Sequence, residues 1–128
     1  MIQYFKSVLE QDPAPVVLCN LEHQIIYMNP SACERYRKYG GERLMGRNLL
    51  ACHDKGSAER ICQVLDWFGA DAANNRVLTG YSEEENKDVY MVALRDPAGM
   101  LIGYYEKHEF RSRDTALAYA ALRDNVDG

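Results

Sequence analysis

The sequence predicts an α+β domain, built as a five-stranded antiparallel sheet with helices covering one face and further helices flanking it at both ends. Two observations predict this class. Residues 16–32 and residues 88–110 are each a pair of apolar runs broken by a short polar turn, which is typical of a β-hairpin. The segments between these hairpins carry apolar residues at helical spacing. Helices wrapped across one sheet in this order form a cup that can hold a ligand.

Length and composition predict one domain over residues 1–128. We expect its core at residues 5–110, an N-terminal helix over residues 1–11 and a C-terminal helix over residues 112–124. A chain of 128 residues is long enough to bury a sizeable core. Apolar residues make up 47% and charged residues 27%, as in ordinary soluble globular proteins.

Charge and hydropathy argue against two classes of partner. The formal net charge is −4 with both signs interspersed, so no basic stripe predicts nucleic-acid binding. The uncharged apolar runs are too short to span a bilayer, and the N-terminus lacks the pattern of a signal peptide. We therefore expect a cytoplasmic protein with no nucleic acid or membrane as a direct partner.

The first part of the chain predicts a helix followed by a hairpin. Apolar residues at helical spacing in residues 1–11 stop before Pro13, which ends the helix. Strands are predicted over residues 16–20 and 24–28. Their turn has no glycine, so His23 is expected in the left-handed backbone region, where histidine is tolerated better than most residues.

Two helical segments follow this hairpin. Asn29 is a strong N-cap, and Pro30 suits the first helical turn, so a helix is predicted to begin there and run within residues 30–39. A longer helix is predicted over residues 57–68, with Ser57 as its cap and its apolar residues on one face.

Three strands complete the predicted sheet, over residues 76–82, 88–95 and 100–110. The last two are joined by a tight turn of the sequence DPAG. Both sets of alternating residues in the middle strand are apolar: Val89, Met91 and Ala93 against Tyr90, Val92 and Leu94. Because both faces then need covering, we expect a homodimer formed by the outer face of the sheet and the N-terminal helix.

The ordered motifs resemble those of one family. They are VVLCNLEHQIIYMNPSA from residue 16, GRNL from residue 46 and RDPAGMLIGYYE from residue 95. Together they resemble the PAS domain, and the chain departs from it at His23, where many members carry glycine. The resemblance implies a non-enzymatic sensory or interaction module that acts with a downstream domain in signalling or transcription regulation.

The cysteines and histidines predict no catalytic or metal motif. Cys52 and His53 are the obvious nucleophile–base pair, but neighbours in sequence rarely orient toward each other, and no third group orients them. No CxxC pair occurs, so the four cysteines are expected to be reduced and mostly buried. His108 is expected at the surface.

Two cofactors remain alternatives. Light-sensing PAS relatives carry a cysteine directly after Gly-Arg-Asn, where this chain has Leu49, so the light-sensing (LOV) type is not expected and flavin is the weaker alternative. Some PAS sensors bind haem through a histidine near the long helix, which would be His53, with Cys52 as a thiolate alternative. A ligand-free dimerisation module is the third reading.

We expect a ligand between the long helix and the sheet. The predicted contacts on the helical side are Cys52, His53, Ile61 and Leu65, and those on the sheet side are Tyr27, Tyr90, Val92 and Tyr104. A shift of one residue in the sheet would replace Tyr90 and Val92 with Val89 and Met91.

Overall fold

A five-stranded antiparallel sheet forms the centre of the molecule, as the sequence predicts. The computed structural model describes residues 1–127, and Gly128, the last residue of the predicted domain, lies outside the described residues. The strand order is β2-β1-β5-β4-β3, so the last strand of the chain lies in the middle. The strands are β1 (Val16–Asn20), β2 (Ile25–Met28), β3 (Arg76–Ser82), β4 (Lys87–Arg95) and β5 (Leu101–Phe110).

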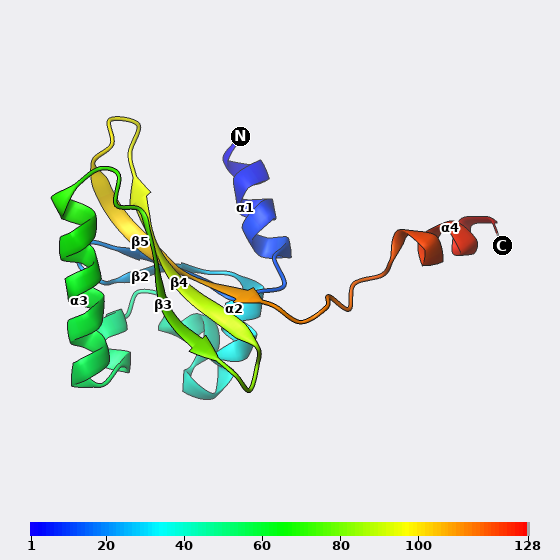
Figure 1. Cartoon of the computed structure of the whole chain (residues 1–128), viewed down its shortest axis with the longest axis horizontal. Coiled ribbons are helices and arrows are strands. Elements are labelled where there is room, and N and C mark those ends of the chain that lie inside the picture. The colour runs from blue at the N-terminus through cyan, green and yellow to red at the C-terminus, as the bar shows by residue number, and fades with distance from the viewer. Residues whose placement is uncertain (128) are drawn as a thin grey trace.

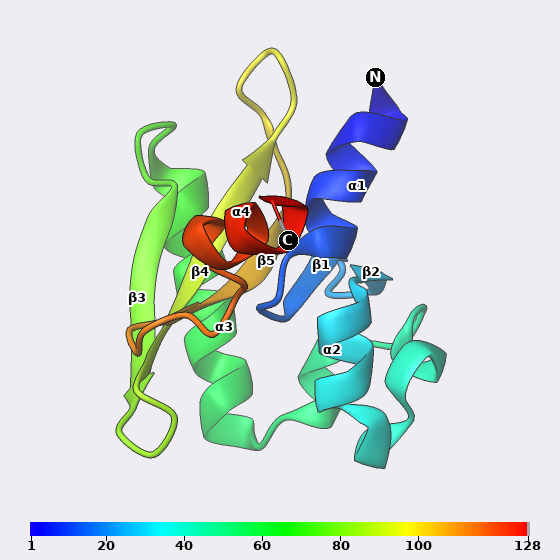
Figure 2. The same ribbon diagram turned by 90° about the vertical axis from the view of Figure 1, so that its right-hand side faces the viewer.

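The helices lie on both sides of this sheet. They are α1 (Ile2–Gln11), α2 (Pro30–Arg35), the 3-10 turns η1 (Arg37–Tyr39), η2 (Gly41–Leu44) and η3 (Leu49–Cys52), α3 (Lys55–Ala70) and α4 (Tyr119–Asp127). In Figure 1, α3 runs along one face, which we call the inner face, and α4 stands away from the sheet. Figure 2 is turned by 90° and shows the side of the sheet away from α3, which we call the outer face; α1 lies on this side.

The hydrophobic core fills the space between the inner face and the helices α2 and α3. Phe68 of α3 and Ala32 of α2 are fully buried. The other buried members are Val17, Cys19, Ile25, Met28, Leu49, Met91 and Tyr104. Helix α1 has no buried residue, so it adds nothing to this core.

Asn29 joins three elements through one buried side chain. Its Oδ1 accepts hydrogen bonds from the backbone N–H groups of Ala32 and Val16, each at 2.9 Å. Its Nδ2 donates to the carbonyl oxygens of Leu9 at 3.0 Å and Ala14 at 2.9 Å. The predicted cap of α2 is therefore confirmed, and the same residue also fixes the end of α1 against β1.

The first hairpin turn is held by a histidine with left-handed backbone. His23 has a φ of 65°, as predicted for this turn. Its Nδ1 lies 2.8 Å from the hydroxyl oxygen of Tyr104, on the central strand β5. Burial lowers the pKa of His23, which favours the neutral ring.

Several predicted boundaries are corrected. Helix α3 begins at Lys55, and the Oδ1 of Asp54 accepts from the N–H of Ser57 at 2.7 Å, so Asp54 rather than Ser57 is the cap. Helix α2 ends at Arg35 and passes into 3-10 turns. The C-terminal helix begins at Tyr119 instead of residue 112.

The cysteines divide into two pairs, contrary to the expectation that most would be buried. Cys19 is buried and Cys33 half-buried, whereas Cys52 and Cys62 are exposed. All four are free thiols. The exposed Cys52 lies on η3, and the exposed Cys62 lies on α3.

Strands β1 and β5 approach each other closely at Gly103. A Cβ at this position would collide with the carbonyl oxygen of Cys19. A glycine is therefore required here by the spacing of the two backbones rather than by an unusual φ. Among residues 1–127, no helix has the length and apolar character needed to cross a membrane.

Candidate functional site

Two cavities lie between the inner face of the sheet and the helices. The first, of about 470 Å³, lies between α3 and the strands β3 and β4, and the second, of about 450 Å³, lies between the 3-10 turns η1, η2 and η3 and the strands β1 and β2. His53 and Glu106 line both cavities. The two cavities therefore meet at this pair of side chains.

The walls of both cavities are mainly apolar. Those of the first include Ile61, Val64, Trp67, Val77, Val89 and Met91. Those of the second include Val17, Ile25, Met28, Tyr36, Leu44 and Leu49. Concave, largely apolar spaces of this size with a few polar groups are typical of small-molecule sites.

Four predicted contact residues lie on the helical side, and three of them reach a cavity. His53 lines both cavities, Cys52 the second and Ile61 the first. Leu65 packs against the hydrophobic core instead. Whether any of them contacts a ligand stays a prediction.

The sheet side of the prediction needs correction. Tyr90 and Val92 pair with Lys107 and Tyr105 on the outer face, whereas Met91 pairs with Glu106 on the inner face. The alternative parity, with Val89 and Met91, is the one that lines the first cavity. Both residue sets of β4 are apolar, so the sequence pattern alone could not decide between the two parities.

The two other predicted tyrosines lie apart from the cavities. Tyr104 is on the inner face but is buried in the core beside Cys19. Burial raises the pKa of its hydroxyl. Tyr27 lines a groove between α1 and α2, together with Glu10 and Cys33. Neither tyrosine borders the space at Glu106.

Glu106 is the functional candidate that the sequence analysis missed. It lies near the middle of β5, and its partners on the neighbouring strands are Val17 and Met91. Its Oε1 lies 3.1 Å from the Nε2 of His108. Two residues apart on one strand, these side chains share the inner face. The available signal was Tyr104, which was predicted to face the cavity, because a side chain two residues further along a strand points to the same face.

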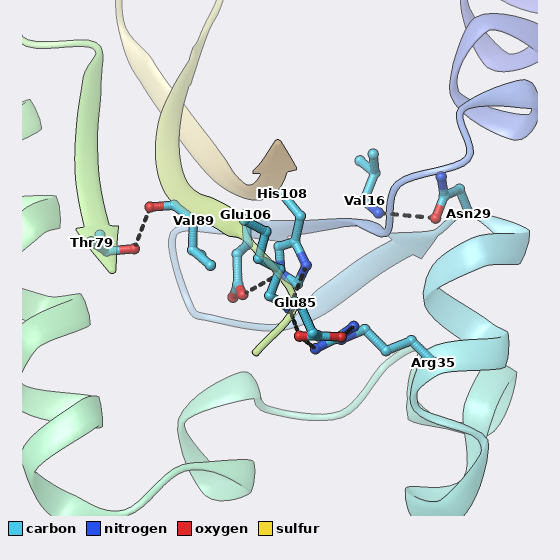
Figure 3. A network of polar contacts seen from close by, with 9 residues as sticks. Val16, Asn29, Arg35, Thr79, Glu85, Val89, Glu106 and His108 are labelled. Carbon is cyan, nitrogen blue, oxygen red and sulfur yellow. Dashed lines mark hydrogen bonds and ion pairs between the residues drawn. The ribbon is translucent and has the colours of Figure 1, made fainter. Parts of the chain in front are cut away.

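His108 is buried, contrary to its predicted place at the surface, because both ring nitrogens have protein partners. Its Nδ1 lies 3.2 Å from the Nζ of Lys87. The Nζ of Lys87 lies 2.7 Å from Glu85, whose two carboxylate oxygens each accept from Arg35 at 2.9 Å. Figure 3 shows this chain of contacts from Glu106 to Arg35. We call these five residues the inner network.

The donors of the inner network determine the protonation of its histidine. A lysine ammonium only donates, so the Nδ1 of His108 must accept, and the proton of the neutral ring is then on Nε2. That Nε2–H donates to Glu106. Burial by itself would raise the pKa of Glu106, but the hydrogen bond from His108 and the nearby charge of Lys87 lower it. The inner network therefore presents an ionised carboxylate to the cavities.

His53 lines the same space as Glu106, and one of its ring nitrogens already has a hydrogen-bond partner. Its Nδ1 lies 2.9 Å from the carbonyl oxygen of Leu49, and since a carbonyl only accepts, Nδ1 carries the proton. The Nε2 lone pair is then available. Among residues 1–127, no group of three or more His, Cys, Asp or Glu side chains is arranged to hold a metal ion.

A family model described as "PAS fold" matches residues 9–107. The chain belongs to the PAS family. This match runs from the end of α1 to the second half of β5, so it includes the sheet, both cavities and Glu106. No curated protein matches the sequence significantly. The PAS fold is therefore established for this domain.

Solved structures agree with this PAS assignment. The C-terminal domain of a Streptococcus mutans protein is similar with a TM-score of 0.66 at 21% identity, over 85% of this chain and 84% of that one. A PAS domain from Colwellia psychrerythraea has a TM-score of 0.63 at 14% identity, over 85% and 95%. A sensory box sensor histidine kinase from Vibrio cholerae has a TM-score of 0.58 at 12% identity, over 84% and 89%.

Proposed function

We propose that this PAS domain is a non-enzymatic sensor that binds a small molecule in the two cavities and regulates a downstream signalling or transcription partner. The observation that carries the proposal is the meeting of the cavities at His53 and Glu106. Each cavity has a volume within the range of small-molecule sites. Helix, 3-10 turn and sheet all contribute walls, so an occupant would contact elements that are able to move relative to one another.

The path from the cavities to the output is the central strand β5. Glu106 lies on this strand, and β5 continues through residues 111–118 to α4. A ligand shifts a conformational equilibrium only through contacts that differ between two states. Contacts made at Glu106 act directly on the strand that leads to the C-terminal helix.

Ligand occupancy is tested by filling the first cavity. Val64→Trp would fill the space beside α3, and Ile102→Trp is the matched control because Ile102 is an exposed residue outside both cavities. We expect mass spectrometry of denatured protein to detect a co-purified small molecule with the parent and the control, and not with Val64→Trp. Absence of such a molecule from the parent, together with unchanged stability of Val64→Trp, would leave a ligand-free dimerisation module as the function.

Self-association is part of the same proposal. Helix α1 exposes Ile2, Tyr4, Phe5 and Val8. An apolar stripe of this kind is typical of a surface that a second copy covers. We expect Phe5→Glu to weaken a homodimer, with Lys6→Glu as the matched control for a charge change on the same helix. Light scattering that shows a monomeric parent chain at high micromolar concentration would contradict the dimer.

Haem is the second candidate cofactor, and one observation favours it. A histidine that ligates a metal usually donates its other N–H to a carbonyl or carboxylate, as the Nδ1 of His53 does to Leu49. Bound haem would supply an iron able to bind a diatomic gas. An absorption spectrum after addition of haemin would show a Soret band that His53→Ala removes and Cys52→Ala retains. A spectrum with no Soret band rejects haem, and flavin bands in the purified protein would identify flavin instead.

A further inference from the structure

Glu106 places a carboxylate on the inner face of the sheet, at a position where side chains are usually apolar. Glu106 stands between Val17 and Met91 on the adjacent strands, and both of these neighbours are buried. The Glu106 side chain itself is 29% exposed, and it lines both cavities. An ionised carboxylate in such surroundings is costly unless each oxygen has partners.

The inner network satisfies one side of this carboxylate and leaves the other side open. His108 donates to Oε1, and no described residue forms a hydrogen bond with Oε2. Arg47 lines the second cavity and Arg60 the first, and neither forms an ion pair with Glu106. An ionised carboxylate accepts several hydrogen bonds, so acceptor capacity remains facing the cavities.

The charges behind Glu106 keep it anionic without neutralising it. Arg35 and Lys87 are positive, Glu85 and Glu106 are negative, and His108 is neutral, so the inner network has no net charge. The inner network therefore provides no spare cation for the open oxygen.

We propose that Glu106 is the anionic anchor for a small apolar molecule that carries a protonated amine. This inference rests on the proposed function, because it names the chemical class of the ligand for the same cavities. The ammonium group donates to the open Oε2, which supplies the partner that the protein lacks, and a charge-assisted bond of this kind is stronger than a neutral one. The apolar body packs against Ile61, Val64 and Met91 of the first cavity.

The chemistry of the probe separates this proposal from general binding. Three amines are used: 2-phenylethylamine, tryptamine and cyclohexylmethylamine. Each is compared with the alcohol and the carboxylic acid of the same ring system, at one pH and ionic strength, by calorimetry with the full chain. We expect at least one amine to bind roughly tenfold or more tightly than its alcohol, because the alcohol forms no charge-assisted bond, and the carboxylate to bind most weakly.

Two variants connect this preference to the residue. Glu106→Gln preserves shape and removes the charge, and we expect it to weaken binding of the amine roughly tenfold or more while leaving the alcohol unchanged. Glu109→Gln is the matched control on the outer face of the same strand. Circular dichroism melting confirms that both variants fold; should Glu106→Gln not fold, Glu106→Asp, which keeps the charge but retracts it, must show the same selective loss.

Each other outcome overturns the inference in a defined way. Equal binding of amines, alcohols and acids, or an amine affinity unchanged in Glu106→Gln, removes Glu106 as the anchor but leaves the cavities as a ligand site. If none of the three amines binds and a co-purified molecule without an amine is found, Glu106 is likewise not the anchor and the cavities remain a ligand site. No binding by any probe, with no co-purified molecule, overturns both this inference and the proposed function.

Discussion

The two faces of the β4–β5 pair each carry a set of charged side chains, and the two sets differ in surroundings rather than in geometry. On the inner face, Lys87 lies 2.7 Å from Glu85 with its side chain 5% exposed. On the outer face, Lys107 lies 2.9 Å from Glu109 with its side chain 38% exposed. The outer network consists of Arg76, Asp88, Lys107, Glu109 and Arg111.

The distance between the charged atoms of an ion pair therefore does not determine how much the pair contributes to stability. Solvent and salt screen the outer network, so its pairs contribute little to stability. In the inner network Lys87 and His108 are shielded from water, with side chains 5% and 4% exposed, so their polar groups depend on protein partners.

The largest expected effect compares two lysines. Lys87→Met leaves the Nδ1 of His108 without its donor and Glu85 with Arg35 alone, so we expect the free energy of unfolding to fall by about 1.5–3 kcal/mol, the range for hydrogen bonds to charged groups. Lys107→Met removes an exposed pair, so we expect a change of less than about 1 kcal/mol. Urea unfolding measures both. Equal losses of free energy of unfolding would mean that the burial of Lys87 does not strengthen its contribution relative to that of Lys107.

A second comparison uses acid. Hydrogen bonds from Arg35 and then Lys87 lower the pKa of Glu85 from its ordinary 4.5 to about 2. A carboxylate with a lowered pKa stabilises the folded state above its unfolded pKa, and that contribution is lost as pH falls from about 4.5 toward about 2. We expect Glu85→Gln to flatten the acid decline of stability in this window.

Glu109→Gln is the outer-face control for the acid experiment. Hydrogen bonding from Lys107 lowers the pKa of Glu109 too, and that carboxylate belongs to the screened outer network. We expect its variant to flatten the decline less than Glu85→Gln does, and raised salt to reduce the difference from the parent. Thermal melting from pH 5 to pH 2 gives the profiles, and a steeper decline for Glu85→Gln would reverse the assigned sign.

The smallest expected effect lies at the edge of the outer network. Arg76 and Glu109 approach to 3.5 Å, and the guanidinium of Arg76 also lies 3.8 Å from the centre of the Tyr90 ring. We expect a double-mutant cycle of Arg76→Gln and Glu109→Gln to give a coupling of about 0.2–1 kcal/mol at low salt, falling at high salt. A coupling insensitive to salt would indicate that the outer network is better shielded than its exposure suggests.

Local chemistry was predictable from the sequence, and the inner network was not. Asn29 and His23 act at the positions where their side-chain and backbone preferences placed them. The inner network depends on partners from α2, the β3–β4 turn and two strands, and no local pattern connects Arg35 to His108. The sheet parity failed for a related reason, because apolar residues on both faces of β4 give no preference. His108 was expected at the surface because its buried partner, Lys87, is 21 residues away in the sequence and no local pattern pairs the two.

The close approach at Gly103 has a consequence for strand slippage. Gly103 stands opposite Asn20, with the carbonyl of Cys19 where a Cβ would lie. A slip of β5 by one residue in either direction would bring Ile102 or Tyr104 to that point, where a side chain does not fit. The same slip would turn Glu106 to the outer face, since successive side chains of a strand alternate. The absence of a Cβ at Gly103 therefore fixes the register of β5 against β1, and this register keeps the carboxylate of Glu106 on the inner face.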